Sequence, residues 1–580
     1  MEAVNNITSK FSKLNPFAKP GRDEDDVGEA TDSYSVGGGG HGARVSQITK
    51  EELRVSRAIK RYILEEKILT LDESDLLSEK STGALKELLD RPHINIPRAL
   101  TDRGRPLTEY FISSSHNTYL MAHQLYGSSS AVAYEAALKA GLRCVEIDAW
   151  DNDDSPEEPK VTHGYTLTSS IPFRNVCETI RDVYDREMAE PVLESGYQAA
   201  PILLSLENHC GDHGQLRLVN IMKEVWGDRL LSERVRDEGS REEQGTGEHV
   251  HLVELASKIA VIVEYHLPNE ADSDDDSEAD ESEEAKEDRE AYRKKKEECP
   301  QGIIIPELAK LGVYAQSVKP ANNSWFESEL EDRPNNHLIN VSESGLLPLV
   351  SKYSDKIGKH NAQHLMRVYP KGTRITSKNL NPVPFWGIGA QICALNAQTF
   401  DASMQLNEAL FAGSDGFVLK PAPLRAGGNG ILGSGQKKKL RLRVAGASNL
   451  PIPKDREADD VKPYVTCSLV HPDDVESKPP KKKTSGYHQH KLGLLHKGEN
   501  PPNTDPIWNE TLEWEYEDNE LTFLRILIKS DDSWARNPVF AVSAVRLLYL
   551  VNGWSFIRLL DLKGRETHCT LLVEFQISDA

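Results

Sequence analysis

The order of strand-like and helix-like runs along this chain constrains its fold more than any other feature. Short β-branched runs (FISSS, RCVEID, ILLSLEN and KIAVIVEY) alternate with longer runs of helical period (AVAYEAALKAGL, PFRNVCETIRDVYDREM and GQLRLVNIMKEVW). The alternation resumes after residue 303 with LINVSES, LMRVYPKGTRIT, QICALNAQT and GFVLKP. Repeated strand–helix units predict a parallel sheet covered by helices. An α/β fold with one (β/α)8 barrel, split in sequence by an insertion, fits this order better than two separate domains.

The insertion is strongly acidic. Residues 270–290 carry 13 acidic and 2 basic side chains, a net charge of −11, which is half of the formal −22 of the whole chain. Because like charges repel and apolar residues are nearly absent, residues 268–302 are predicted to be a disordered linker. A solvated spacer is one interpretation. The other is that a mobile polyanion covers a site and is repelled by anionic membranes, so that it restrains activity until the enzyme is held at a surface.

Composition also divides the rest of the chain. The runs EELRVSRAIKRYILEEKIL and STGALKELLD predict a short helical segment, which contains no calcium loop of the DxDxDG type. After the glycine-rich break APLRAGGNGILGSGQKKK, alternating runs such as LRLRVAG and PYVTCSL predict an all-β antiparallel sandwich. The predicted units are 1–46 (disordered), 47–100 (helical), 101–267 (first half of the barrel), 303–425 (second half) and 436–578 (sandwich).

Targeting signals and disulfide patterns are not visible. No apolar run approaches the ~18 residues of a membrane-spanning helix, and the N-terminus lacks the apolar core of a secretory signal. Seven scattered cysteines without a CxxC pair predict free thiols in a reducing compartment. We therefore expect a cytoplasmic protein, and we expect it to act as a monomer without a nucleic-acid partner.

Polar side chains stand where several of the predicted strands end. They are His116 and Asn117 in FISSSHNTYL, Glu146 and Asp148 in CVEIDAW, His163 in VTHGYTL, and Glu207 in PILLSLENHC. Loops at the carboxyl ends of parallel strands gather distant side chains around one point. Within one strand, residues i and i+2 share a face, so Glu146 and Asp148 point the same way.

The carboxylate and amide side chains of this set offer only oxygen ligands. Such a set suits a hard cation, Ca²⁺ or Mg²⁺, rather than Zn²⁺, and Ca²⁺ is favoured because many protein oxygens converge. Taken singly, each residue is as well explained as a surface carboxylate or a core histidine, but the position of all six at strand ends weakens that explanation. A rival zinc site would use His209, Cys210 and His213 in ENHCGDHG. No second ligand pair follows, and turn residues are a sufficient account of them.

These motifs carry a family resemblance. SSSHNTYL, CVEIDAWD, HGYTLTS and LSLENHC resemble the first catalytic block of the eukaryotic phosphoinositide-specific phospholipases C, residues 303–425 resemble the second block, and the final segment resembles the family's C2 domain. The arrangement is most similar to the delta-like forms of fungi and plants, without a pleckstrin-homology domain and with at most a reduced EF-hand region. The resemblance implies a TIM-like barrel that uses Ca²⁺ and acts peripherally on anionic membranes. It would cleave inositol phospholipids to diacylglycerol and a soluble inositol phosphate.

The resemblance also implies roles for the site residues. By motif position, Asn117, Glu146, Asp148 and Glu207 would hold Ca²⁺, and His116 and His163 would flank the phosphate. Coordination to a cation lowers the pKa of the inositol 2-hydroxyl, so that a carboxylate can take its proton. Glu146 is the first candidate for this base and Glu207 the second. His116 would donate to the phosphoryl oxygens, His163 would protonate the leaving diacylglycerol oxygen, and water would open the cyclic phosphodiester.

Headgroup recognition departs from the family pattern. The resemblance implies that Ser342, Arg367 and Tyr369 grip ring phosphates and stack on the inositol. The family usually carries two lysines where this chain has Ile262 and Glu264, and a glutamate repels phosphate. Other lysines, such as Lys258 or those in YRKKKEE, supply the charge in one interpretation. In the other, the enzyme prefers phosphatidylinositol or its monophosphate over the bisphosphate.

Membrane contact is implied at two places. An apolar ridge around the mouth of the site matches Leu125, Tyr165, Leu167, Leu349 and Trp386, which we expect to be exposed and to insert into the membrane. The C2-like segment offers Asp455, Asp459, Asp460, Asp531 and Asp532 as calcium ligands. Its last loop lacks one aspartate of the usual DxD pattern, so the lysines of KPPKKKTSGYHQHK are an alternative contact with anionic lipid.

A different class of function stays open. The same barrel could serve a catalytically silent protein that binds inositol lipids or acts as a scaffold. Retention of both histidines and all the metal-binding side chains argues against it, because binding alone needs neither a general acid nor a base.

Overall fold

The computed structural model of this 580-residue chain describes residues 28–29, 52–76, 81–120, 130–162, 170–192, 196–236, 240–244, 247–267, 303–328, 330–370, 379–453, 456–475, 477–490, 500–531 and 539–580. The predicted linker at 268–302 and almost all of 1–46 lie outside these ranges. Within them, no helix is long and apolar enough to cross a bilayer. The described cysteines are buried free thiols.

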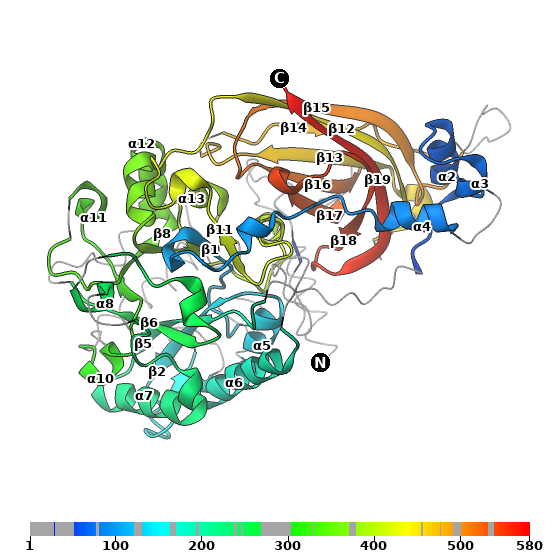
Figure 1. Cartoon of the computed structure of the whole chain (residues 1–580). Helices are drawn as coiled ribbons and strands as arrows, with labels where there is room; N and C mark the ends of the chain where they lie inside the picture. Colours follow the sequence, from blue (N-terminus) through cyan, green and yellow to red (C-terminus); the bar gives the residue numbers. More distant parts are fainter. Residues whose placement is uncertain are drawn as a thin grey trace, which may run out of the picture.

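Eight parallel strands form a barrel, which occupies the lower left of Figure 1. They are β1 (Tyr110–Ile112), β2 (Cys144–Trp150), β5 (Ile202–His209), β6 (Ile259–Glu264), β7 (Gln316–Val318), β8 (His337–Ser342), β9 (Leu365–Tyr369) and β10 (Ile392–Cys393). A parallel bridge between Ser114 and Cys144 joins β1 to β2 and closes the ring. Since β6 and β7 pair directly, the two halves of the sequence meet in one barrel. This confirms the predicted split α/β barrel.

Short strands and helices surround the barrel. β3 (Lys160–Val161) and β4 (Ile171–Pro172) extend β2, and β11 (Phe417–Leu419) runs antiparallel to β1. The helices are α5 (Ala131–Lys139), α6 (Phe173–Ala189), α7 (Asp212–Trp226), α8 (Arg241–Gln244), α10 (Pro306–Ala309), α11 (Ser324–Glu327), α12 (Glu343–Asn361), α13 (Val383–Gly387) and α14 (Ala402–Leu410). In α6, Phe173, Val176, Ile180 and Val183 are buried at three- and four-residue spacing, so one face packs inward.

The C-terminal segment forms an antiparallel sandwich of two layers. One layer contains β14 (Lys481–Lys483), β13 (Pro463–Val470), β16 (Phe523–Ser530) and β17 (Val539–Arg546), and the other contains β18 (Gly553–Leu560), β19 (Glu566–Asp579), β12 (Lys437–Ser448) and β15 (Ile507–Glu517). Alternate residues such as Leu442, Val465, Ile526 and Leu571 are buried in one core between the layers. This confirms the predicted all-β unit.

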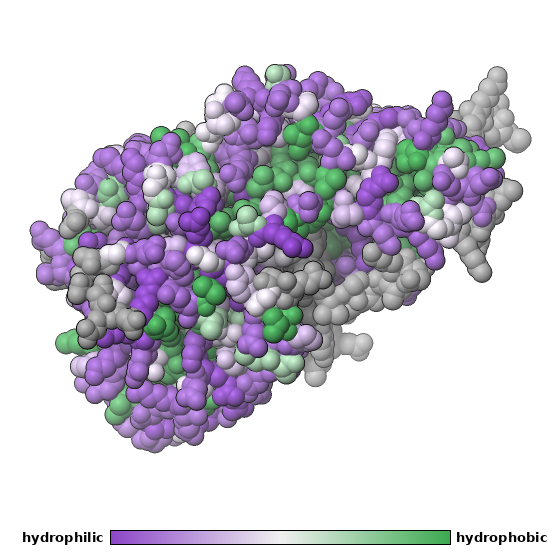
Figure 2. All heavy atoms as spheres, in the orientation of Figure 1, coloured by the Kyte–Doolittle hydropathy of each residue, from purple (hydrophilic) through white to green (hydrophobic). Residues whose placement is uncertain are grey.

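The short N-terminal helices pack on the sandwich, at the end that lies away from the barrel (Figure 1). They are α2 (Arg57–Glu65), α3 (Leu71–Ser74) and α4 (Gly83–Asp90). Ile59 and Ile63 of α2 share a core with Ala445 of β12. Figure 2 shows hydrophobic residues gathered over the sandwich and beside these helices, whereas hydrophilic residues dominate the visible surface of the barrel.

The barrel and the sandwich are joined by polar contacts at α14. Arg525 Nε donates to Gln405 Oε1 at 2.7 Å, and the Tyr549 hydroxyl donates to the Leu410 carbonyl at 2.9 Å. Glu29 links the same two bodies through its backbone, which donates to the Leu562 carbonyl at 2.8 Å and accepts from the Phe400 N–H at 3.3 Å. The barrel and the sandwich therefore form a continuous structure.

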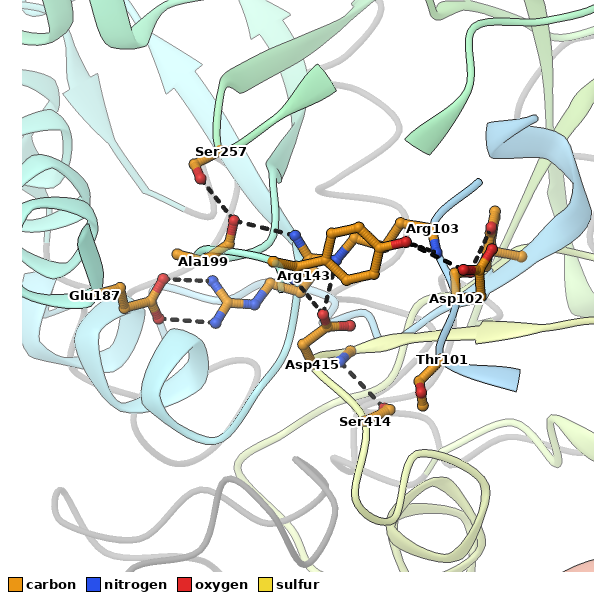
Figure 3. Close-up of polar contacts among 12 residues, drawn as sticks. Thr101, Asp102, Arg103, Arg143, Glu187, Ala199, Ser257, Ser414 and Asp415 are labelled. Atoms are coloured by element: carbon orange, nitrogen blue, oxygen red, sulfur yellow. Dashed lines mark hydrogen bonds and ion pairs between the residues drawn. The ribbon is translucent and has the colours of Figure 1, made fainter. Parts of the chain in front are cut away.

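Two ion pairs, which we call the amino-end pairs, lie at the amino ends of the barrel strands (Figure 3). Arg143, directly before β2, donates two parallel bonds to Glu187 of α6, at 2.9 and 2.8 Å. Arg103, before β1, contacts Asp415, before β11, and its Nε donates at 2.9 Å. Arg103 Nη1 also donates to the Ala199 carbonyl at 3.4 Å. These pairs attach α6 to the sheet and join the segments that precede β1 and β11.

Candidate active site

Polar side chains from four strands converge inside the barrel, toward its carboxyl end. Asp148 of β2 lies beside Glu207 of β5 in parallel register, and Glu146 precedes Asp148 on the same face. Arg367 of β9 donates to Glu146 Oε1 at 2.6 Å and to Asn340 Oδ1 of β8 at 3.1 Å. We call Glu146, Asp148 and Glu207 the acidic cluster. The predicted carboxylates are therefore brought together at one point.

The turn after β1 orients two members of this cluster. Asn117 has a left-handed backbone with φ +47°, a conformation that asparagine tolerates better than most residues. Its N–H donates to Glu146 Oε2 at 2.6 Å. The Tyr119 hydroxyl donates to Asp148 Oδ2 at 2.7 Å and lies 3.0 Å from Asn117 Oδ1. The tight turn thus holds Asn117 beside both carboxylates.

Asp148 carries an unsatisfied oxygen. Its Oδ1 atom is buried and has no hydrogen-bond partner among the described residues. A buried acceptor without a partner costs free energy, so such atoms mark strain or a ligand position. Burial and the neighbouring Glu207 and Glu146 raise the pKa of Asp148 well above its usual range. A bound cation would give the Asp148 oxygen a partner and would offset the repulsion among the three carboxylates.

One guanidinium lies beside the three carboxylates. Besides its bond to Glu146, Arg367 places Nη1 3.6 Å from Glu207 Oε1. The Glu146 side chain is 2% exposed and the Glu207 side chain 34%, so Glu207 faces the mouth. Burial raises the pKa of Glu146 to about 8, although Arg367 opposes the rise. Burial also acts on Glu207, but Arg367 and the hydrogen bond with Glu146 outweigh it and hold the pKa of Glu207 well below its usual value.

Two members of the acidic cluster and one neighbouring histidine form a group that could hold a metal ion. Asp148, Glu207 and His209 each offer a ligand atom, and these atoms lie within 4.8 Å of one another. The His209 ring stacks on Trp150 with centroids 4.1 Å apart, which fixes its orientation. Two carboxylates, an unsatisfied oxygen and excess negative charge fit a hard divalent cation.

The His116 ring is fixed next to this cluster. Its Nδ1 lies 2.8 Å from Asn396 Oδ1, and its backbone N–H donates to the Leu395 carbonyl at 2.8 Å. With Asn396 Oδ1 as the acceptor, Nδ1 carries the proton, which sets the tautomer. Asn396 is itself held by Asn379, whose side-chain nitrogen donates to the Asn396 carbonyl at 3.2 Å.

Comparison with family models assigns most of the barrel and the sandwich. The model "Phosphatidylinositol-specific phospholipase C, X domain" matches residues 103–265, the corresponding Y domain matches 308–423, and the C2 domain matches 438–553. The chain belongs to the phosphatidylinositol-specific phospholipase C family. The resemblance carried by the sequence motifs is thereby confirmed.

Curated relatives in this family include delta-type enzymes. The chain is 32% identical over 528 residues to "1-phosphatidylinositol 4,5-bisphosphate phosphodiesterase 1" of Candida albicans, a match covering 80% of this chain and 46% of that protein. It is 30% identical over 503 residues to "1-phosphatidylinositol 4,5-bisphosphate phosphodiesterase delta-1" of Homo sapiens, a match covering 83% of this chain and 61% of that protein. The chain thus spans about half to three fifths of the length of these relatives.

A solved structure shares the fold. The crystal structure of L. pealei PLC21 aligns with a TM-score of 0.64 at 23% identity, covering 87% of this chain and 60% of that chain. At this level of identity the likeness supports the fold alone. It agrees with the barrel and sandwich described above.

The structure contradicts the predicted exposure of Trp386. This side chain is 1% exposed, and its ring packs against Phe111, Phe411 and Phe523 with centroids 6.3, 6.5 and 5.8 Å apart. A ring of this size fills the junction between the barrel and strand β16 of the sandwich, so Trp386 belongs to the core. Of the other predicted ridge residues, Leu349 is half-buried on α12.

Several predicted residues lie outside the described part of the chain. They are His163 and the ridge residues Leu125, Tyr165 and Leu167, together with Asp455 and Asp532 of the C2-like loops. The rival zinc residues are described but separate: the Cys210 thiol is buried beside Asp151, and His213 Nε2 lies 2.9 Å from Glu157 on the surface. In the described residues, only His209 of that set joins a metal-binding group.

The predicted headgroup residues of the second half lie toward the same end of the barrel. Ser342 lies opposite Tyr369 in register, and its Oγ accepts the Gly345 N–H at 3.2 Å, which caps α12. The Arg367 guanidinium lies 5.7 Å from the centre of the Tyr369 ring. The sequence did not reveal that Arg367 is a partial counter-charge of the acidic cluster, because a contact across a barrel leaves no local pattern.

Other residues of the site were also missed. Tyr119, Asn340 and Asn396 orient the predicted residues. His209, named above only for the rival zinc site, joins Asp148 and Glu207. The sequence could have indicated Tyr119 as a site residue, since it lies two residues after Asn117 in the same motif. Asn396 had none, because it reaches His116 from 280 residues away.

Proposed function

We propose that this chain is a calcium-dependent phospholipase C that acts at membrane surfaces in lipid signalling. It hydrolyses phosphatidylinositol or its phosphorylated forms to diacylglycerol and a soluble inositol phosphate. The observation that carries the proposal is the buried acidic cluster with its unsatisfied Asp148 oxygen, beside the fixed His116 ring. The printed names of the relatives, which are phosphodiesterases of phosphatidylinositol 4,5-bisphosphate, support the same reaction class.

Calcium would be held by the side chains that sequence analysis selected. Asn117, Glu146, Asp148 and Glu207 supply oxygen ligands of the kind that Ca²⁺ prefers, and His209 lies within the same group. When bound, the ion lowers the pKa of the inositol 2-hydroxyl and makes it a nucleophile at neutral pH. Arg367 is a partial counter-charge for Glu146 and Glu207.

Glu146 is the first candidate for the general base. The Asn117 N–H and the Arg367 guanidinium orient its two oxygens, so its position is well defined. Because its pKa is raised, Glu146 once deprotonated is a stronger base than Glu207. Glu207 is the second candidate. Its low pKa keeps it ionised but makes it a poor proton acceptor.

His116 would stabilise the phosphoryl oxygens. Because Nδ1 donates to Asn396, the ring can donate from Nε2 only in its protonated form. The inositol 2-oxygen attacks phosphorus, and the phosphorus–oxygen bond to diacylglycerol breaks. His163 would give the leaving oxygen its proton. Water then opens the cyclic phosphodiester with the acid and base roles reversed.

Membrane contact would involve both bodies of the protein. Leu349 lies near the exposed Leu347 on the first turns of α12, whose N-cap is Ser342. Leu125, Tyr165 and Leu167 remain predicted members of the same ridge. The lysines of β14 are exposed and would contact anionic lipid. Inositol phospholipids in an anionic membrane are thus the expected partners.

The test is release of water-soluble inositol phosphate from mixed micelles as free calcium is varied. Release should require calcium and should disappear in His116→Ala and His163→Ala. His213→Ala removes a surface histidine and serves as the matched control. A silent inositol-lipid binding protein would bind the micelles and release nothing, with or without calcium, and that result would refute the proposal.

A further inference from the structure

The face of β6 that points into the site carries no lysine. Ile262 pairs in register with Ser205 and is buried, and Glu264 lies two residues farther on the same face. The Glu264 side chain is 11% exposed, and its Oε2 accepts the Asn208 N–H at 3.2 Å. Lys258 does not supply the missing charge, because its Nζ donates to the Asp228 carbonyl at the amino end of β6.

A cation does reach this region from the next strand. Ser317 of β7 pairs with Glu264, and Val318 pairs with Ile339. Continuing that register places Lys319 beside Asn340, which itself pairs with Arg367. Lys319 therefore enters the same layer of the barrel as Arg367, on the face that carries the acidic cluster.

Lys319 lies beside Glu264, and its charge also acts on Glu207 of the acidic cluster. Its Nζ lies 3.9 Å from Glu264 Oε1, a distance that is electrostatic and too long for a hydrogen bond, and its side chain is 21% exposed. Burial raises the pKa of Glu264, and Lys319 opposes that rise. Lys319 also contributes to the low pKa of Glu207, so its charge acts on both Glu264 and Glu207.

We propose that Lys319 is the specificity-determining cation of the headgroup site and that Glu264 restricts the site to one ring phosphate. This inference rests on the phospholipase C function proposed above. An ammonium has three donors and binds phosphate as a point charge. A second ring phosphate would lie near the Glu264 carboxylate, which repels it. The monophosphate is therefore preferred over phosphatidylinositol because of Lys319, and over the bisphosphate because of Glu264.

The experiment compares turnover of the three lipids in mixed micelles at one free calcium concentration. In the wild type, kcat/KM should be highest for the monophosphate. Lys319→Met should lower the ratio of monophosphate to phosphatidylinositol turnover roughly tenfold, the scale of one charge-assisted contact. Glu264→Gln keeps an acceptor for the Asn208 N–H and should raise the ratio of bisphosphate to monophosphate turnover. Lys258→Met is the matched control and should change neither ratio.

Two results would overturn the inference while leaving the proposed function intact. One is a wild type that prefers the bisphosphate, and the other is a Lys319→Met variant with unchanged ratios. If no lipid is hydrolysed, the proposed function fails instead. Calorimetry with two soluble headgroups then decides on Lys319: inositol 1,4-bisphosphate, which represents the monophosphate lipid, and inositol 1-phosphate, which represents phosphatidylinositol. If the wild type binds the first more tightly and Lys319→Met binds both equally, the inference is supported. If the wild type binds both with equal affinity, the inference is overturned.

Discussion

The two ends of the barrel arrange charge in opposite ways. In the amino-end pairs, each guanidinium meets one carboxylate, and Figure 3 shows these contacts between neighbouring elements. In the acidic cluster at the carboxyl end, three carboxylates converge beside Arg367, and the pKa of Glu146 and of Asp148 is raised by burial. The same fold thus contains matched charges at one end and unmatched charges at the other.

The difference indicates that the charges at the amino end serve stability and that the charges at the carboxyl end serve ligand binding. A matched buried pair keeps the structure together, because removing either member leaves an uncompensated charge. Unmatched carboxylates cost folding free energy unless something else supplies positive charge. Their retention at the carboxyl end therefore indicates a ligand, and the predictions below test whether the two ends respond in opposite directions.

The largest effect is expected for Asp148→Asn. We expect a loss of turnover of roughly a thousandfold or more, as for other changes that remove charge stabilisation from a reacting centre. In calcium-free buffer the Tm should rise, because one of the repelling carboxylates is gone while Tyr119 keeps an acceptor. Lipid hydrolysis and thermal melts measure the two effects. Asp415→Asn in an amino-end pair is the control, which should lower the Tm and leave the activity of the folded enzyme unchanged.

The amino end should respond through stability. Arg143→Met leaves Glu187 partly buried without its partner, so the free energy of unfolding should fall by about 3 kcal/mol. Replacing both residues by methionine should recover most of this loss, because the pair is exchanged for apolar packing. Urea unfolding measures both variants. If the double variant is as unstable as the single one, the charge pairing is not the cause.

Calcium should stabilise the wild type through the carboxyl end. A ligand at a hundredfold excess over its Kd adds about 2.7 kcal/mol to the free energy of unfolding. We therefore expect the Tm to rise with calcium and to return with a chelator. Asp148→Asn should lose this rise, whereas Arg143→Met should keep it. A rise that persists in Asp148→Asn would place the calcium effect elsewhere, for example in the sandwich.

The smallest effect is a pH dependence without calcium. Glu146 has a pKa of about 8 in the folded state, above its value of about 4.3 in an unfolded chain, so the folded state binds the extra proton. Stability should therefore fall as the pH rises from 5 to 8. Melting curves across this range should show a shallower slope for Glu146→Gln. Equal slopes for the wild type and Glu146→Gln would mean that groups other than Glu146 determine the pH dependence of stability.

Sequence patterns predicted the barrel and the sandwich because each follows from local periodicity. The strand ends also selected Glu146, Asp148 and Glu207, since parallel register brings such ends together. Contacts between distant segments left no such pattern. The burial of Trp386 depends on strand β16 of the sandwich, and the contact of Lys319 with Glu264 depends on pairing across the insertion.

Direct pairing of β6 with β7 has a consequence for how this chain can vary. Val263 lies opposite Gln316 and Glu264 opposite Ser317, so the strands on either side of the insertion pair directly with each other. The free-energy cost of closing a loop grows only slowly, by about 0.6 kcal/mol for each doubling of the loop length. The segment between the halves can therefore lengthen, shorten or change composition at little cost to the barrel. Regulatory sequence can be gained at this point without disturbing the acidic cluster at the carboxyl end.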